Sequence, residues 1–186
     1  MAVIIGLAAL VFLQAESPRT WPSAEDWVRA NQAITRLEAA AFPALPPTVS
    51  QELKKRGCTI PQAFTGGDAH NVVKGRLTSD TAMDSAVLCS RGRISSILVF
   101  PGGSATAVME FAQEADAHFL QVTGPRQIGY SRALRLASAQ YIRERRDPRE
   151  KLPPLDHDGI EDVFIEKSSL VWYWHGGRWL RLAGAD

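Results

Sequence analysis

Apolar residues recur three or four positions apart near the start of the chain, at Trp27, Ala30, Ile34, Leu37 and Ala41. This spacing predicts one face of a helix. Ser23 precedes the pattern, and Asp26 lies three residues after Ser23, which is the arrangement of a capping box. The prolines within 42–47 end this helix because they lack a backbone donor. A second helix is predicted over 48–56, and Gly57 is the glycine that commonly follows a helix.

The middle of the chain changes to apolar runs separated by glycine and proline. Strands are predicted at 72–77, 85–90 and 94–100, with Arg91-Gly92-Arg93 as the last turn between them. Helical spacing of Val108, Phe111, Ala112 and Ala115 then predicts a helix over 104–117. Further strands are predicted at 119–122 and 132–136. A basic helix at 139–146, capped by Ser138, follows them.

The chain ends in a hairpin. Residues 170–175 and 178–182 flank Gly176-Gly177, the composition that a two-residue primed turn needs. One face of the hairpin carries Leu170, Trp172, Trp174, Trp179 and Arg181. Either Trp21 and Trp27 from the N-terminal helices cover this face, or Trp172, Trp174, Trp179 and Arg181 form an exposed platform. We expect the first; the second would bind a glycan, a small molecule or a protein partner.

These elements predict an α+β fold in which N-terminal helices pack on a mainly antiparallel, meander-like β-sheet that ends in the Trp-rich hairpin. The length of 186 residues fits one domain, which we place at 16–186. The balance of 21 basic and 20 acidic residues gives no indication of a nucleic-acid partner.

Residues 3–13 form an apolar run followed by Gln14-Ala15-Glu16. This pattern is typical of a signal peptide, predicted at 1–15, although no Lys or Arg follows Met1. The alternative is an N-terminal helix packed in the core. The run is too short to span a bilayer, so no stable membrane span is expected after cleavage. We therefore expect a periplasmic or secreted protein.

The expected compartment bears on the redox state of Cys58 and Cys89, the two cysteines of the chain. An even number of cysteines in an oxidising compartment predicts one disulfide. Two buried free thiols are the alternative.

The segment 156–162 reads Asp-His-Asp-Gly-Ile-Glu-Asp and precedes an apolar run. If Gly159 makes a turn, Asp156, Asp158, the carbonyl of Ile160 and Asp162 are candidate Ca²⁺ ligands. The site would be incomplete, because Pro154 occupies the first ligand position. The alternative is a solvated turn bracketed by ion pairs. A hydrolase using His157 and the neighbouring aspartates is a further reading.

Residues 77–88 align without gaps with residues 155–166, which pairs Asp80 with Asp158 and Asp84 with Asp162. With Gly75 in front, the earlier segment resembles an FG-GAP or VCBS-type repeat, whose acidic turn binds calcium in a β-propeller blade. The resemblance implies ligand roles for Asp156, Asp158 and Asp162. It implies no ion in the earlier segment, where Arg76 and Thr78 replace ligands.

Segments 56–62, 86–89 and 156–159 also resemble a group of uncharacterised exported bacterial proteins. That resemblance implies a compartment and no activity. The function expected from the sequence is an exported binding or structural module.

Overall fold

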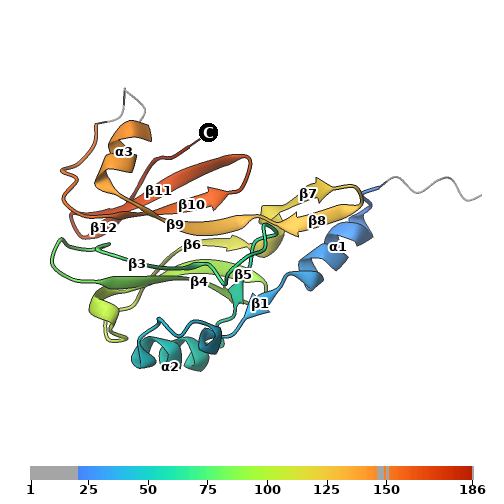
Figure 1. Ribbon diagram of the computed structural model, residues 1–186, viewed down its shortest axis with the longest axis horizontal. Helices are drawn as coiled ribbons and strands as arrows, with labels where there is room; N and C mark the ends of the chain where they lie inside the picture. The colour runs from blue at the N-terminus through green and yellow to red at the C-terminus, as the bar shows by residue number, and fades with distance from the viewer. Residues whose placement is uncertain (1–20, 146–148, 150, 186) are drawn as a thin grey trace, which may run out of the picture.

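The computed structural model describes residues 21–145, 149 and 151–185. Two four-stranded antiparallel sheets lie face to face (Figure 1). The first sheet contains β3 (Val72–Gly75), β4 (Asp84–Arg91), β5 (Ile94–Phe100) and β6 (Met109–Ala115). The second contains β9 (Arg132–Ala137), β10 (Gly159–Phe164), β11 (Ser168–His175) and β12 (Arg178–Ala183). Each sheet is a meander, because its strands are neighbours in chain order.

The main core lies between the two sheets. The first sheet contributes alternate residues, including Ala86, Leu88, Ile97 and Val99. Leu134 and Ile160 of the second sheet pack against them. Alternation places these side chains on the inner faces, because successive residues of a strand point to opposite sides.

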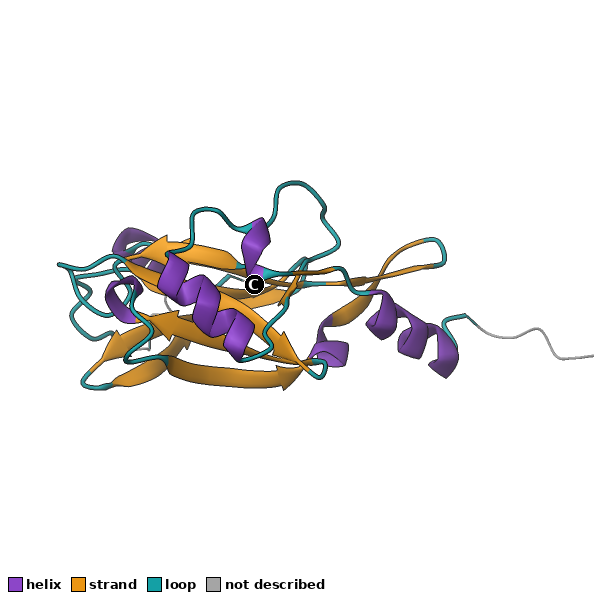
Figure 2. Cartoon of the chain, turned by 90° about the horizontal axis from the view of Figure 1, so that it is seen from below, coloured by secondary structure: helices purple, strands orange, loops and turns teal. Residues whose placement is uncertain are grey.

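The outer face of the first sheet is covered by α2 (Pro47–Lys55) and the short 3-10 helix η1 (Ala39–Ala41). Val49 and Leu53 of α2 are fully buried against Val87 and Leu98. Seen from below, α2 lies across the strands of this sheet (Figure 2).

The outer face of the second sheet is covered by α3 (Ala139–Arg145). Ile142 of α3 packs against Val171 and Tyr173, which are all fully buried. The fold therefore has four layers, in the order helix, sheet, sheet, helix.

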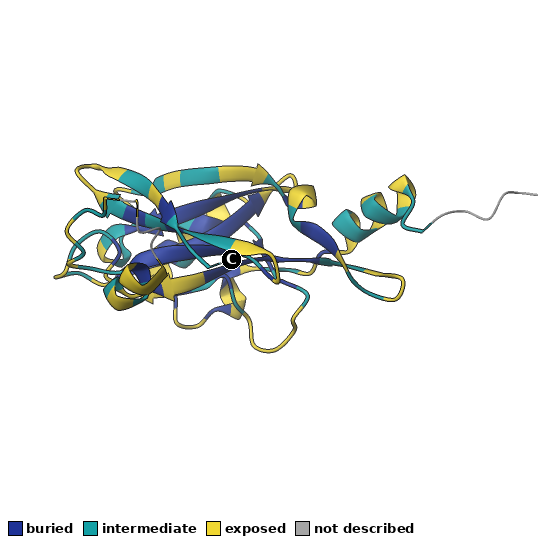
Figure 3. Cartoon of the chain, turned by 90° about the horizontal axis from the view of Figure 1, so that it is seen from above, coloured by how far each residue is buried: buried dark blue, intermediate teal, exposed yellow. Residues whose placement is uncertain are grey.

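One part of the molecule extends beyond these layers. It consists of α1 (Ala24–Ala33) and the hairpin of β7 (Leu120–Gly124) and β8 (Gln127–Tyr130). No residue of α1 is buried (Figure 3). A small sheet of β1 (Arg36–Leu37) and β2 (Ile60–Pro61) and the 3-10 helix η3 (Asp116–Phe119) connect this part to the sandwich, and η2 (Pro101–Gly103) follows β5.

Several local predictions are confirmed. Ser23 and Asp26 form the capping box of α1. Gly57 follows α2 with a φ of 67°. The C-terminal hairpin has the predicted register, with Trp174 opposite Trp179, and both turn glycines have positive φ. The α+β class, the antiparallel strands and the Trp-rich hairpin are also as predicted.

Two helix predictions are wrong in extent or type. The first helix ends at Ala33, and Leu37 lies in β1, where it pairs with Ile60. Residues 109–115 form β6 rather than a helix, and Phe111 pairs with Ile97. Ala112 has a φ of 54° where the β5–β6 register shifts. This bulge makes the apolar spacing look helical.

The strand predicted at 119–122 is β7, but no sequence signal predicted its partner β8. The predicted signal peptide at 1–15 lies outside the described residues.

Candidate functional site

Asp162 of β10 lies at the interface between the sheets. Its two carboxylate oxygens accept hydrogen bonds from Arg132, Oδ1 from Nε at 2.9 Å and Oδ2 from Nη2 at 2.8 Å. Trp172 donates its indole N–H to Oδ2 at 3.3 Å. Burial lowers the pKa of Arg132, but the bonds and charge of Asp162 outweigh this and leave the pKa raised. Asp162 is therefore half of a buried ion pair.

Arg132 also connects the second sheet to the first. Its Nη2 donates to the carbonyl of Ala112 at 3.0 Å, and its guanidinium lies over the ring of Phe119. A neighbouring buried phenol, Tyr130, has its hydroxyl 3.4 Å from Ser95 Oγ. Burial raises the pKa of Tyr130 well above its ordinary value. These contacts make one end of the sandwich polar.

The other two aspartates of the acidic segment have different partners. Asp158 Oδ2 accepts the backbone N–H of Arg76 at 3.2 Å, and the backbone N–H of Asp158 donates to the carbonyl of Arg76 at 2.8 Å. Asp156 Oδ1 accepts from the hydroxyl of Tyr173 at 3.1 Å. Asp158 thereby joins the second half of the chain to the segment after β3, while Asp156 stays on the outer side of β11.

Gly159 is not the turn glycine. It is the first residue of β10, and a Cβ there would lie 2.8 Å from Val171 and 2.9 Å from the carbonyl oxygen of Trp172. Close packing, rather than a positive φ, requires glycine here. Ile160 is fully buried in the same strand, between β9 and β11.

The predicted ligands Asp156, Asp158, Ile160 and Asp162 are thus not brought together around one centre. Among residues 21–145, 149 and 151–185, no three His, Cys, Asp or Glu side chains are grouped as a metal site. This geometry gives no support to the Ca²⁺ prediction.

His157 is held by the backbone. Its Nε2 lies 3.0 Å from the carbonyl oxygen of Trp174, and its Nδ1 lies 2.9 Å from that of Asp158. Its ring stacks on Tyr173 with centroids 4.3 Å apart. Both nitrogens face backbone acceptors, so neither is available to a substrate as a general base.

The tryptophan face is covered by β6. Phe111 stacks on Trp179, with ring centroids 4.5 Å apart, and meets Trp172 edge to face at 5.3 Å. Trp174 is half-buried beside Trp179, and Arg181 is exposed. The expected cover by Trp21 and Trp27 is wrong, because α1 packs mainly against β7, β8 and η3. The predicted platform of Trp172, Trp174, Trp179 and Arg181 is therefore only partly open.

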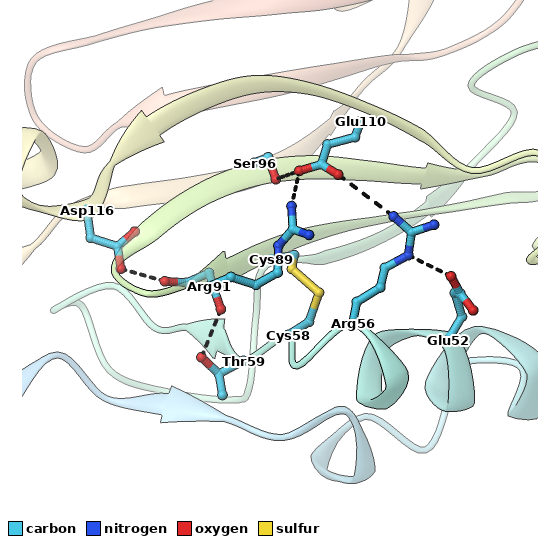
Figure 4. The surroundings of a disulfide bond; sticks show 10 residues. Glu52, Arg56, Cys58, Thr59, Cys89, Arg91, Ser96, Glu110 and Asp116 are labelled. Atoms are coloured by element: carbon cyan, nitrogen blue, oxygen red, sulfur yellow. Dashed lines mark hydrogen bonds and ion pairs between the residues drawn. A yellow bond between two sulfur atoms is a disulfide. The ribbon is translucent and has the colours of Figure 1, made fainter.

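The predicted disulfide is present. Cys58 and Cys89 are bonded and buried, and the bond connects the end of the α2 segment to the first sheet. Beside it, Glu110 accepts from Arg91 and from Ser96, and lies 3.8 Å from Arg56, which donates to Glu52 at 2.7 Å (Figure 4). The buried sulfurs indicate a structural bond rather than an exchanging one.

A groove lies beside α1, where the helix meets the loop 62–70 and the β7–β8 hairpin. It consists of two adjoining cavities of about 470 and 540 Å³. The residues that line both cavities are Ala30, Ala33, Phe64, Ile128 and Gly129. We call this space the α1 groove.

Small side chains produce the α1 groove. A Cβ on Gly129 would lie 2.5 Å from the Cβ of Phe64, so glycine allows that ring to approach β8. The backbone N–H of Phe64 donates to the carbonyl of Tyr130 at 2.7 Å and fixes the loop there. Ala30 and Ala33 leave space where longer side chains of α1 would fill it.

Two polar side chains, Gln62 and His70, line the end of the groove formed by the loop 62–70. Both form hydrogen bonds with the backbone of this loop. Gln62 Oε1 accepts the backbone N–H of His70 at 2.9 Å, and Gln62 Nε2 donates to the carbonyl of His70 at 3.0 Å. His70 Nε2 accepts the backbone N–H of Ala63 at 2.7 Å. These bonds leave a predominantly apolar surface for a ligand.

The opposite end is more polar. Arg126 of the hairpin turn and Gln127, the first residue of β8, line it together with Asp26 and Arg29 of α1. Arg29 bonds to Asp26 at 2.5 Å, so its charge is balanced within the helix. Sequence patterns did not predict this groove, because alanine and glycine carry no recognisable chemistry.

Comparisons with protein-family models, curated proteins and solved structures find no match for this chain. No helix in the described ranges is long and apolar enough to cross a membrane. We therefore infer function from the geometry of the site.

Proposed function

We propose that the protein is an exported binding module that takes an elongated, uncharged apolar ligand into the α1 groove. The observation that carries this proposal is the pair of adjoining cavities beside a helix that has no buried residue. Pockets of several hundred Å³ that combine apolar walls with a few polar groups are typical ligand sites, and the walls that the two cavities share are apolar.

Export is proposed from two features. The buried Cys58–Cys89 bond is compatible with an oxidising compartment. The apolar run at 3–13 has the length of the hydrophobic region of a signal peptide, which favours a periplasmic or secreted location.

The groove favours a binding role over hydrolysis. His70 is the one histidine among the described residues that line the groove; its Nε2 accepts a backbone N–H, and its Nδ1 lies 3.1 Å from the carbonyl oxygen of Asp68. His157, the base of the hydrolase alternative, is occupied on both ring nitrogens in a different part of the molecule. Neither ring is placed to take a proton from a bound molecule.

The ligand is expected to be apolar for a specific reason. The walls shared by both cavities contain only alanine, glycine, phenylalanine and isoleucine. Burying a charged group there would cost free energy without a bonded partner, whereas each buried CH₂ contributes about 0.8 kcal/mol.

The test uses N-phenyl-1-naphthylamine, an uncharged aromatic probe that fluoresces in apolar surroundings. We expect wild-type protein to bind it with a Kd on the order of 10 μM. Ala33→Phe places a ring where the two cavities meet, and it should weaken binding by about tenfold, equivalent to about 1.4 kcal/mol.

Ala24→Phe is the matched control. Ala24 is also an exposed alanine of α1, but it does not line either cavity. It should bind the probe as wild type does, and circular dichroism should show that both variants are folded. Equal binding by the two variants, or no binding by wild type, would falsify the proposal.

A further inference from the structure

Another cavity, of about 330 Å³, lies on the side of β1 away from the α1 groove. The described residues that line it are Arg36, Thr59, Ser90, Gly92 and Arg93. Its lining therefore has neither a carboxylate nor an apolar side chain. Arg36 precedes Leu37, which lines the α1 groove, and successive residues of a strand point to opposite faces.

The disulfide holds two of these residues in place. Thr59 follows Cys58 and Ser90 follows Cys89, and the backbone N–H groups of Thr59 and Ser90 each donate to the carbonyl of the other. The hydroxyl of Thr59 also lies 3.3 Å from the Ser90 carbonyl (Figure 4). This part of the cavity is consequently rigid.

Arg36 is held in place by two hydrogen bonds, but some of its N–H donors are unused. Its Nη1 donates to the carbonyl of Ile34 at 3.2 Å, and its Nη2 donates to Asp116 at 2.7 Å. A guanidinium has five N–H donors, so these bonds leave three. One of the three is Nε–H, which is buried and has no hydrogen-bond partner in the described chain. The other two belong to the terminal nitrogens.

Arg93 supplies a second guanidinium from the β4–β5 turn. Its backbone has a φ of 65°, and its carbonyl accepts the N–H of Asp116 at 3.0 Å. The turn is thus fixed, while the side chain is exposed. Asp116 also accepts from the hydroxyls of Ser90 and Ser95. Two guanidinium groups against one carboxylate leave an excess of one positive charge at the cavity.

We propose that this cavity binds a small tetrahedral oxyanion, of the phosphate or sulfate type. Guanidinium groups bind such oxyanions through pairs of parallel N–H···O bonds. Arg36 and Arg93 provide these donors from two elements, β1 and the β4–β5 turn. A tetrahedral group accepts from several directions, whereas a planar carboxylate is matched by a single guanidinium.

The test is an NMR titration of backbone amides with inorganic phosphate, at ionic strength held constant with sodium chloride. We expect saturable shifts at Thr59, Gly92 and Arg93, with a Kd on the order of 1 mM. Sulfate should compete with phosphate, and acetate should bind at least tenfold more weakly. Linear shifts without saturation, or acetate binding as strong as phosphate, would overturn the proposal.

Arg93→Asn and Arg126→Asn form a matched pair. Both arginines are exposed in hairpin turns and have positive φ, 65° and 55°, which asparagine tolerates. Arg93→Asn should weaken phosphate binding about tenfold, and Arg126→Asn should leave it unchanged. Equal loss of phosphate binding in both variants would show that phosphate responds to the overall charge of the protein rather than to this site. Unchanged binding by Arg93→Asn would rule out the site. Probe binding in the α1 groove is measured separately, so the two proposals fail independently.

Discussion

The first and second sheets are both four-stranded antiparallel meanders with a helix on the outer face, yet different contacts hold them. The first sheet is bonded covalently to the segment after α2 through Cys58 and Cys89. The second sheet is joined to its neighbour by the buried pair Arg132–Asp162. Similar strand order therefore does not imply similar sources of stability.

The two aligned aspartates show the same difference at the level of one residue. Asp84 accepts backbone N–H groups from Leu77, Thr78 and Gly102 and fixes the ends of the β3–β4 and β5–β6 connections. Asp162 accepts from side chains, chiefly Arg132. One carboxylate organises loops, and the other neutralises a buried cation.

The largest expected effect is from Asp162→Asn. It leaves Arg132 buried with its charge unpaired, which should lower the free energy of unfolding by about 3–5 kcal/mol. Urea unfolding followed by tryptophan fluorescence measures the loss. Asp84→Asn should cost less, about 1–3 kcal/mol, because hydrogen bonds are lost without exposing an unpaired charge.

The double variant Arg132→Met with Asp162→Leu sharpens this prediction. Removing both charges should restore most of the stability, because apolar residues of similar size can replace a buried ion pair. If the double variant is as unstable as Asp162→Asn alone, the unpaired charge is not the cause.

The next effect is from the disulfide. Cys58→Ala with Cys89→Ala opens a link between residues 31 apart, which should lower the free energy of unfolding by about 3–4 kcal/mol through the entropy of the unfolded chain. Reducing agent should destabilise the wild type by a similar amount and leave the double variant unchanged. A reductant effect of equal size in the variant would contradict the assignment.

The smallest effect concerns pH and Tyr130. Because burial raises its pKa above the ordinary value of 10, the folded protein holds this proton more tightly than the unfolded chain does. The resulting stabilisation is complete below pH 10 and is lost as the pH rises above it. Between pH 9 and 11, wild type should lose about 1 kcal/mol more than Tyr130→Phe in urea unfolding. Equal losses would show that Tyr130 does not titrate differently in the folded state.

Local signals in the sequence predicted local structure well. Ser23, Gly57 and Gly176-Gly177 act within a few residues of themselves, through capping and positive φ. The disulfide was also predictable, because the chain has only two cysteines. These local signals do not indicate which face of each sheet packs against which other element.

The partners of the candidate-site residues could not be predicted from local sequence. Asp162 looked like a metal ligand because its neighbours in the sequence are acidic, but its partner Arg132 is 30 residues away. Phe111 looked helical because the bulge at Ala112 changes the spacing of a strand. The α1 groove depends on absent side-chain volume at Ala33 and Gly129, and sequence patterns do not report volume.

The walls of the α1 groove come from residues 21–37, 62–70 and 123–130, three stretches separated by long intervals of the chain. A fragment that ends before residue 123 lacks the third stretch, so the groove forms only when segments far apart in the sequence have come together. Binding of the fluorescent probe would therefore report that these distant stretches have met.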